Sequence, residues 1–239
     1  MPYFPARKRK VQKLRAKSKR PAKTQLAITG AVARKIVTMG LEQKMYRQLF
    51  TDSMLTNAVA SAVKYKSMVQ IPLGEETYER TGDKVKLNKI TADMIFKTNQ
   101  NVTSDMWALR VSLIRLNSYT DMNFSTFGNI YQNEQGVDQA PLYTDTDGWQ
   151  GLTQKHNTKL FQVLYDRTYI FGNEATNNGT GLQRIKFSKK VNYNITFDAG
   201  ANTTRTPIYL FIHAMNVDGH TTTNTLGFTG YISTYYKDY

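Results

Sequence analysis

The chain has 239 residues, which is enough for one folded domain of about 200 residues with a tail. It contains no cysteine, which excludes disulfides and thiolate metal sites. No apolar run reaches the ~18 residues needed to cross a membrane, so membrane insertion is not expected. The formal net charge of +14 favours a polyanionic partner.

The positive charge is concentrated at the N-terminus. Residues 1–41 carry twelve Lys or Arg and no Asp or Glu, whereas the rest of the chain has twenty basic and eighteen acidic residues, a net charge of +2. Because like charges repel and residues 1–23 offer little apolar surface, this segment is predicted to be a disordered arm that binds nucleic acid. The candidate nucleic-acid-binding residues are Arg7, Lys8, Arg9, Lys10, Lys13, Arg15, Lys17, Lys19, Arg20, Lys23, Arg34 and Lys35.

Residues 24–58 are predicted to form a partly helical linker. Leu41, Met45 and Leu49 recur at a spacing of four, which is typical of one face of a helix. Two glycines interrupt the pattern, so short helical pieces are expected rather than one long helix.

A folded β domain is predicted over residues 59–239, where the hydrophobic pattern changes to a period of two. The first strands are expected at 63–72, 84–96 and 107–113. The apolar residues of the second strand change parity partway along it, which predicts a β-bulge near residues 88–89.

The middle of this domain is less regular than its ends. Residues 117–158 contain only a possible helical turn at 124–131 and a weak strand at 140–144. Strands then resume, and the run at 208–217 is apolar on both parities, so it is expected at the centre of a sheet covered on both faces. The expected strands are 161–171, 185–197, 208–217 and 228–236.

Seven clear strands and one weak one, with turn signals between them and no long helix, indicate an antiparallel β-sandwich or barrel. Residues 82–85 (Gly-Asp-Lys-Val) lead into a long strand, and residues 109–117 (LRVSLIRLN) form the next. With the basic arm, this order of elements resembles the single jelly-roll capsid protein of small circular single-stranded DNA viruses (circovirus-like). It is also similar to the satellite tobacco necrosis virus coat protein.

The resemblance implies an all-β fold of eight antiparallel strands, lettered B to I, in sheets with the orders B-I-D-G and C-H-E-F. Residues 140–144 would take the E position. It further implies a structural protein of the virion, without enzymatic activity or cofactors, of which sixty copies form a T=1 icosahedral shell. The shell would enclose a single-stranded genome, for which the resemblance favours DNA over RNA without deciding between them, and would meet a host cell-surface receptor that the sequence does not identify. Residues 7–10 match a nuclear localisation signal, which would add the host nucleus to the virion as a location.

No catalytic or metal-binding set is recognised in the sequence. The three histidines match no zinc spacing, and no phosphate-binding loop is present. His213 is expected to be a hydrogen-bonded core residue, whereas His156 and His220 are expected in exposed loops.

Two other functions fit parts of the pattern. A cellular nucleic-acid-binding protein with a basic tail would usually carry basic residues on its body too, and here the net charge of the body is only +2. A carbohydrate-binding β-sandwich could use Trp107, Trp149 and the tyrosines, although these residues serve equally well in a core. The body lysines are equally compatible with the inner wall of a shell and with a solvated outer face; they are Lys84, Lys86, Lys186, Lys189 and Lys190.

Overall fold

Long antiparallel strands account for most of the described chain. The computed structural model describes residues 43–54, 59–98, 105–117, 128–142, 153–173, 182–199, 206–216 and 225–238, together with residues 202 and 204. The chain divides into two units, Met1–Glu42 and Gln43–Tyr239, and all described residues belong to the second. Its elements are β1 (Lys44–Met54), α2 (Val59–Ala62), β2 (Val63–Ser67), β3 (Lys84–Thr98), β4 (Asp105–Leu116), β5 (Tyr131–Gln132), β6 (Asp138–Gln139), β7 (Lys155–His156), β8 (Phe161–Asn173), β9 (Leu182–Thr196), β10 (Ile208–Asn216) and β11 (Leu226–Asp238).

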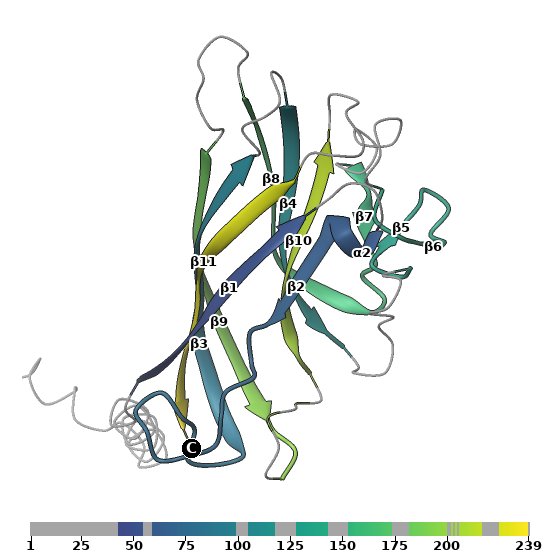
Figure 1. Ribbon diagram of the computed structural model, residues 1–239. Helices are drawn as coiled ribbons and strands as arrows, with labels where there is room; N and C mark the ends of the chain where they lie inside the picture. Colours follow the sequence, from purple (N-terminus) through teal and green to yellow (C-terminus); the bar gives the residue numbers. More distant parts are fainter. Residues whose placement is uncertain are drawn as a thin grey trace, which may run out of the picture. The chain divides into compact units, whose positions relative to one another are not determined.

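Eight of these strands form two four-stranded sheets (Figure 1). One sheet has the order β1-β11-β3-β9 and the other has the order β2-β10-β4-β8, and every neighbouring pair is antiparallel. Most strands of the two large sheets that follow one another in the sequence, such as β3 and β4, lie in opposite sheets, whereas β4 and β8 are neighbours in one sheet. The prediction of an all-β antiparallel sandwich is confirmed.

Alternate residues of the strands fill the space between the two sheets. Side chains of both sheets belong to one buried apolar cluster, in which Trp107 and Phe96 are among the largest fully buried residues. Such alternation is expected when one face of each sheet meets a core and the other does not. Strand β10 differs because residues 208–215 are all buried, and its place between β2 and β4 confirms the prediction of a strand covered on both faces.

The phase slip predicted in the second strand is a β-bulge in β3. In the pairing with β11, Leu87 lies opposite Tyr236 and Lys89 lies opposite the adjacent Tyr235, which leaves Asn88 as the extra residue. A bulge of this kind restores the alternation on either side of the extra residue. The apolar residues before and after it consequently all point into the core.

Two predictions about the eighth strand are wrong. Residues 44–54, placed in a helical linker from the sequence, form β1, which pairs with β11 over its whole length. The rest of that linker, at 24–42 and 55–58, lies outside the described residues. Residues 140–142 belong to no strand, so the described part of the weak strand expected at 140–144 does not supply the eighth strand. Residues 143–144 lie outside the description.

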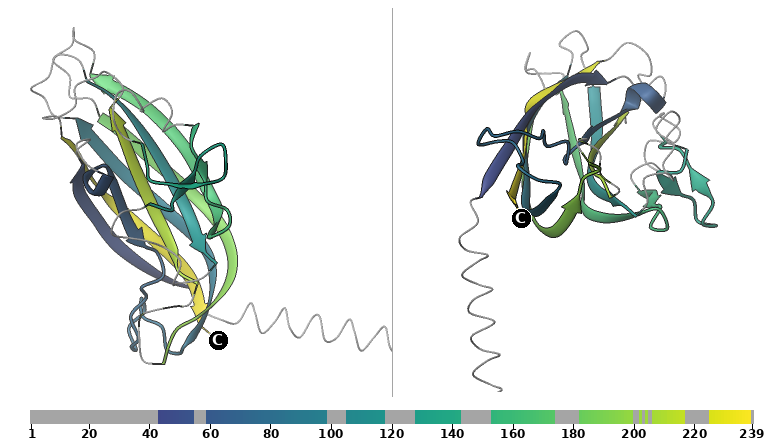
Figure 2. Two further views of the ribbon diagram at one scale, coloured as in Figure 1. Left: turned by 90° about the vertical axis from the view of Figure 1, so that its right-hand side faces the viewer. Right: turned by 90° about the horizontal axis from the view of Figure 1, so that it is seen from below.

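A small third sheet covers part of the outer side of the β2-β10-β4-β8 sheet (Figure 2). It has the order β6-β5-β7 and contributes Ile130 and Tyr131 to a second apolar cluster. Strand β10 contributes Tyr209 and Phe211 to the same cluster, which explains why both of its parities are apolar. Two apolar layers therefore exist, one between the large sheets and one beneath the small sheet.

Candidate nucleic-acid interface

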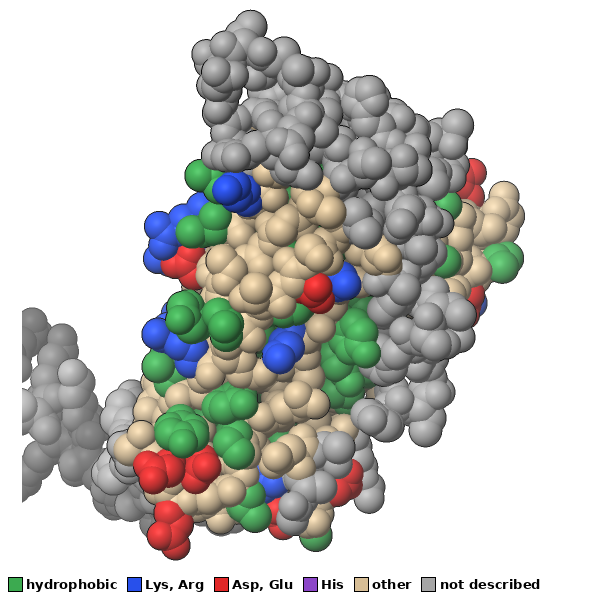
Figure 3. All heavy atoms as spheres, viewed as in Figure 1, with side chains coloured by type: hydrophobic (Ala, Val, Ile, Leu, Met, Phe, Trp, Pro, Cys, Tyr) green, Lys and Arg blue, Asp and Glu red, His purple; other side chains and the backbone are tan. Residues whose placement is uncertain are grey.

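One outer surface of the sandwich is strongly basic. On the β1-β11-β3-β9 sheet, the side chains that alternate with the core residues point away from the core, and nine of them are Lys or Arg. Along the left margin of Figure 3, Lys and Arg side chains alternate with hydrophobic ones. We call this surface the basic face; its cations are Arg47, Lys84, Lys86, Lys89, Lys97, Arg184, Lys186, Lys190 and Lys237.

Sequence alternation and strand pairing together produce this concentration of charge. Seven of the nine cations lie on β3 and β9, on the outward parity of each strand, and the ladder between the two strands places Lys89 beside Lys190. The bulge at Asn88 keeps Lys86 and Lys89 on the same side of the sheet. Because a strand rises by about 3.3 Å per residue, alternating cations form rows with a spacing of about 6.6 Å.

A single carboxylate, that of Asp93, lies among these cations in the described part of the sheet. Asp93 accepts two hydrogen bonds from Arg184, from Nε at 2.8 Å and from Nη2 at 2.7 Å, and its Oδ2 lies 3.8 Å from Nζ of Lys186. The hydrogen bonds from Arg184 lower the pKa of Asp93. Asp93 is therefore ionised at neutral pH and balances the charge of one neighbour, which leaves the face with a large positive excess.

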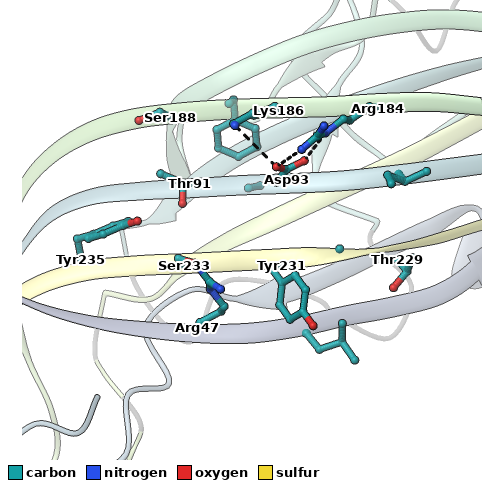
Figure 4. A pocket seen from close by; sticks show the side chains of 15 residues that line it. Arg47, Thr91, Asp93, Arg184, Lys186, Ser188, Thr229, Tyr231, Ser233 and Tyr235 are labelled. Atoms are coloured by element: carbon teal, nitrogen blue, oxygen red, sulfur yellow. Dashed lines mark hydrogen bonds and ion pairs between the residues drawn. The ribbon is translucent and has the colours of Figure 1, made fainter. Parts of the chain in front are cut away.

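The middle of the basic face is hollowed into a trough of about 800 Å³ (Figure 4). All four strands of the sheet line it, and Arg47, Tyr231, Tyr235, Asp93 and Arg184 are among the lining residues. The guanidinium of Arg47 lies 5.5 Å from the centroid of the Tyr231 ring. Charged and aromatic groups thus meet on one open surface, as in sites that bind nucleic-acid strands.

Gly230 allows Tyr231 to occupy the centre of this surface. A Cβ atom at Gly230 would lie 2.5 Å from Cα of Met94 on the neighbouring strand, which is closer than such atoms can approach. Strand β11 therefore comes close to β3 at this point. Tyr231 follows directly and is paired on both sides, with Leu49 of β1 and Asp93 of β3.

The residues proposed from the sequence are distributed in three ways. All twelve arm residues, from Arg7 to Lys35, lie outside the described residues. Four of the five body lysines considered, namely Lys84, Lys86, Lys186 and Lys190, lie on the basic face. The fifth, Lys189, shares the parity of the core residues of β9. The low net charge of the body gave no indication of this face. The alternation of Lys and Arg along residues 84–97 and 184–190 could have predicted it.

The other large sheet carries a different polar group, which lies beneath the small sheet. Asp166 of β8 accepts hydrogen bonds from Arg110, from Nε at 3.0 Å and from Nη2 at 2.8 Å. It also accepts one from Ser112 at 2.9 Å. Arg110 donates in addition to the backbone oxygen of Gln154 at 2.6 Å. These bonds join β4 and β8 to Gln154, which directly precedes β7 of the small sheet.

His156 and Ser112 lie together in this group but not in the arrangement of a catalytic triad. Nε2 of His156 is 3.2 Å from the hydroxyl of Ser112 and also 3.2 Å from Oδ2 of Asp166. A triad needs the carboxylate on one ring nitrogen and the hydroxyl on the other. Here both share one nitrogen, and Nδ1 has no hydrogen-bond partner among the described residues. The geometry does not prepare Ser112 as a nucleophile.

The two described histidines are both enclosed. His213 is buried, with Nδ1 3.4 Å from the hydroxyl of Tyr131, in agreement with its predicted core position. The prediction that His156 is an exposed loop residue is wrong, because the side chain lies in β7 with 7% of its surface accessible. Burial lowers the pKa of His213 to about 3 and also lowers that of His156. His220 lies outside the described residues.

No protein-family model matches this chain, and no curated protein matches it in sequence. Within the described ranges, no three His, Asp or Glu side chains converge in a way that would hold a metal ion. In the same part of the chain, no helix has the length and apolar character that a membrane span requires.

Proposed function

We propose that this protein is a viral capsid protein that assembles into a small icosahedral shell around a single-stranded genome. In this proposal, the N-terminal arm and the basic face of the sandwich bind the nucleic acid, and the sandwich itself contacts its own copies. The chain has a structural role in the virion rather than an enzymatic one.

The order of the strands carries the proposal. When the eight long strands are lettered B to I along the chain, β1 is B, β4 is E and β11 is I. The observed sheets then read B-I-D-G and C-H-E-F. These are the two orders that the resemblance to single jelly-roll capsid proteins implies, although E is β4 rather than residues 140–144. We therefore propose that the sandwich is a jelly roll.

The distribution of charge supports a genome as the partner. Residues 1–41 carry twelve cations without a carboxylate, and the basic face carries nine with one carboxylate. Cations release condensed counterions from phosphates without reading the base sequence, which suits a protein that must bind a whole genome. Sixty arms would neutralise on the order of 700 phosphates, counting one charge per nucleotide.

Particle size and nuclease protection test this proposal together. Full-length protein, purified with its nucleic acid, is expected to sediment as a megadalton particle and to appear as closed shells by electron microscopy. The enclosed nucleic acid should resist nuclease. A variant of full length in which the ten basic residues of positions 1–23 are replaced by Gln should protect far less nucleic acid. A 27.3 kDa monomer at high concentration, without nucleic acid, would overturn the proposal.

A nucleic-acid-binding protein that does not assemble is the second candidate, and the basic face favours it. The low net charge of the body is an argument against this candidate, but nine of the twenty Lys and Arg residues of the body lie on one surface. The same sedimentation experiment separates the two, since this candidate would bind nucleic acid as a monomer or small oligomer. The carbohydrate-binding alternative loses one of its proposed residues, because Trp107 is fully buried. Trp149 lies outside the described residues.

A further inference from the structure

The trough on the basic face has an apolar floor that phosphate binding does not explain. Tyr231 is 54% exposed, and its neighbours Leu49 and Ile95 are 56% and 45% exposed. The first two are paired directly across β1 and β11, and Ile95 lies on β3 near Asp93. Large apolar side chains exposed together and surrounded by charge indicate a binding surface.

Tyr231 is held in a fixed position on this floor. It lies on β11, an inner strand that pairs with β1 on one side and with β3 on the other. The requirement for glycine at position 230 fixes the local approach of β11 to β3. Because the backbone of a paired inner strand is already ordered, binding there orders only the side chain, and a tyrosine ring has few rotatable bonds to fix.

The cations around the ring stand where a nucleic-acid backbone would need them. The guanidinium of Arg47, on β1, lies over the Tyr231 ring at 5.5 Å from its centroid, and Figure 4 shows Arg184 and Lys186 on the far side of the trough, on β9. Neighbouring strands are about 4.8 Å apart, so the four strands present these charges across about 14 Å. A backbone running across the sheet would meet cations before and after the base that stacks.

We propose that Tyr231 is a stacking site for unpaired nucleotides, so that the basic face prefers single-stranded nucleic acid over duplex. This deepens the proposed function and rests on it for the identity of the ligand. A base in a duplex is covered by its neighbours and does not offer a face to the ring, whereas an unpaired base does. Asp93 is engaged with Arg184, so it does not read base edges, and no base preference is expected.

The test uses full-length protein in which the twelve arm cations are replaced by Gln, so that the arm does not conceal the contribution of the face. The probes are fluorescein-labelled dT20, rU20 and a 20-base-pair duplex, titrated at 50 mM salt and followed by anisotropy. In this background, Tyr231→Leu is expected to weaken binding of both single strands by about 10- to 100-fold and to leave duplex binding within about twofold. Stacking on one ring accounts for a loss of this size.

Two further variants separate stacking from other effects. Tyr231→Phe retains the ring and should bind single strands like the parent. Tyr78→Leu removes a tyrosine of similar exposure outside the basic face. It should leave the affinity for single strands and for duplex unchanged. Equal losses for single strand and duplex, a loss in Tyr231→Phe, or no loss in Tyr231→Leu would each overturn the stacking site.

Particle formation, measured in parallel on the protein with its natural arm, keeps this proposal distinct from the proposed function. If Tyr231→Leu selectively weakens single-strand binding but no particles form, the stacking site stands and the capsid role is wrong. If particles form but Tyr231→Leu has no effect on binding, the capsid role stands and the stacking site is wrong.

Discussion

The two outer faces of the sandwich start from sheets of the same size and end in opposite environments. The residues of β3 and β9 that point outward include seven Lys or Arg and one carboxylate, and that face forms an open basic trough. The outward residues of β10 include Tyr209 and Phe211, and that face is covered by the small β6-β5-β7 sheet. Outward side chains that are apolar have to be covered by another element. Outward side chains that are cationic are stable in water and remain available to a polyanion.

The ion pairs of the two faces differ in their exposure to solvent. Asp93 and Arg184 form two hydrogen bonds in solvent, and Asp166 and Arg110 form two hydrogen bonds of similar length beneath the small sheet. The side chain of Arg110 is 7% accessible, whereas that of Arg184 is 64% accessible. Equal geometry should therefore have unequal energetic consequences, and this contrast can be measured.

Removing the covered carboxylate is expected to give the largest effect. Asp166→Asn leaves the guanidinium of Arg110 enclosed without a counter-charge, and breaking a buried pair in this way costs about 3–5 kcal/mol. Because Asp166 itself is 29% accessible, the lower end of that range is expected. Urea unfolding at pH 7 measures the loss. A free energy of unfolding within 1 kcal/mol of the parent would show that water reaches Arg110 and that this face is not truly covered.

Acid should destabilise the covered face of the sandwich through its two buried histidines. Burial and the charge of Arg110 hold the pKa of His213 at about 3, and burial lowers the pKa of His156 despite its contact with Asp166. An unfolded histidine has a pKa near 6.5, so between pH 6.5 and about 3 the unfolded chain binds more protons than the folded chain. Stability therefore falls as the pH falls, by about 1.4 kcal/mol per pH unit for one such histidine.

The groups that face His213 are Arg110, Tyr131 and His156, on β4, β5 and β7, together with the backbone of Leu142. Asp166 on β8 contacts His156. The pKa of Asp166 is lowered by its hydrogen bonds with His156 and Arg110, against the effect of burial, so it contributes only below about pH 4. Urea midpoints between pH 7 and pH 4.5 thus isolate the histidines. In His213→Gln, the fall in the free energy of unfolding per pH unit should decrease by the amount that one bound proton contributes. An unchanged slope would assign the acid sensitivity to another part of the chain.

Most strands could be predicted from the sequence because apolar and polar residues alternate clearly along them. The prediction failed at β1, where the apolar spacing fits a helix as well as a strand. Met45 and Leu49 are four residues apart, a spacing that suits one face of a helix and also one face of a strand. The pairing with β11, about 180 residues away in the sequence, is what makes these residues a strand rather than a helix. The bulge in β3 was predicted because a parity change has no other simple meaning in a strand.

The site was predicted less well because its charge depends on tertiary arrangement. The sum of charges over residues 42–239 is +2, and a sum does not show that the cations of β3 and β9 share one face with a single carboxylate. The burial of His156 was likewise hidden, since the small sheet that encloses it joins segments around residues 131 and 156. Both features arise from residues that are distant in sequence, and local patterns do not contain them.

The smallest effect on stability is expected on the basic face, from Asp93→Asn. This carboxylate and its partner Arg184 lie in solvent, where an ion pair is screened and contributes little, so the free energy of unfolding should not change measurably. The substitution does remove the single described carboxylate of the face and releases Arg184 for a phosphate. Affinity for dT20 should therefore rise in the protein with a neutralised arm, and the dependence of the binding constant on salt should become steeper. If affinity fell instead, Asp93 would be a direct contact to the bases rather than the partner of Arg184, and the basic face would read sequence.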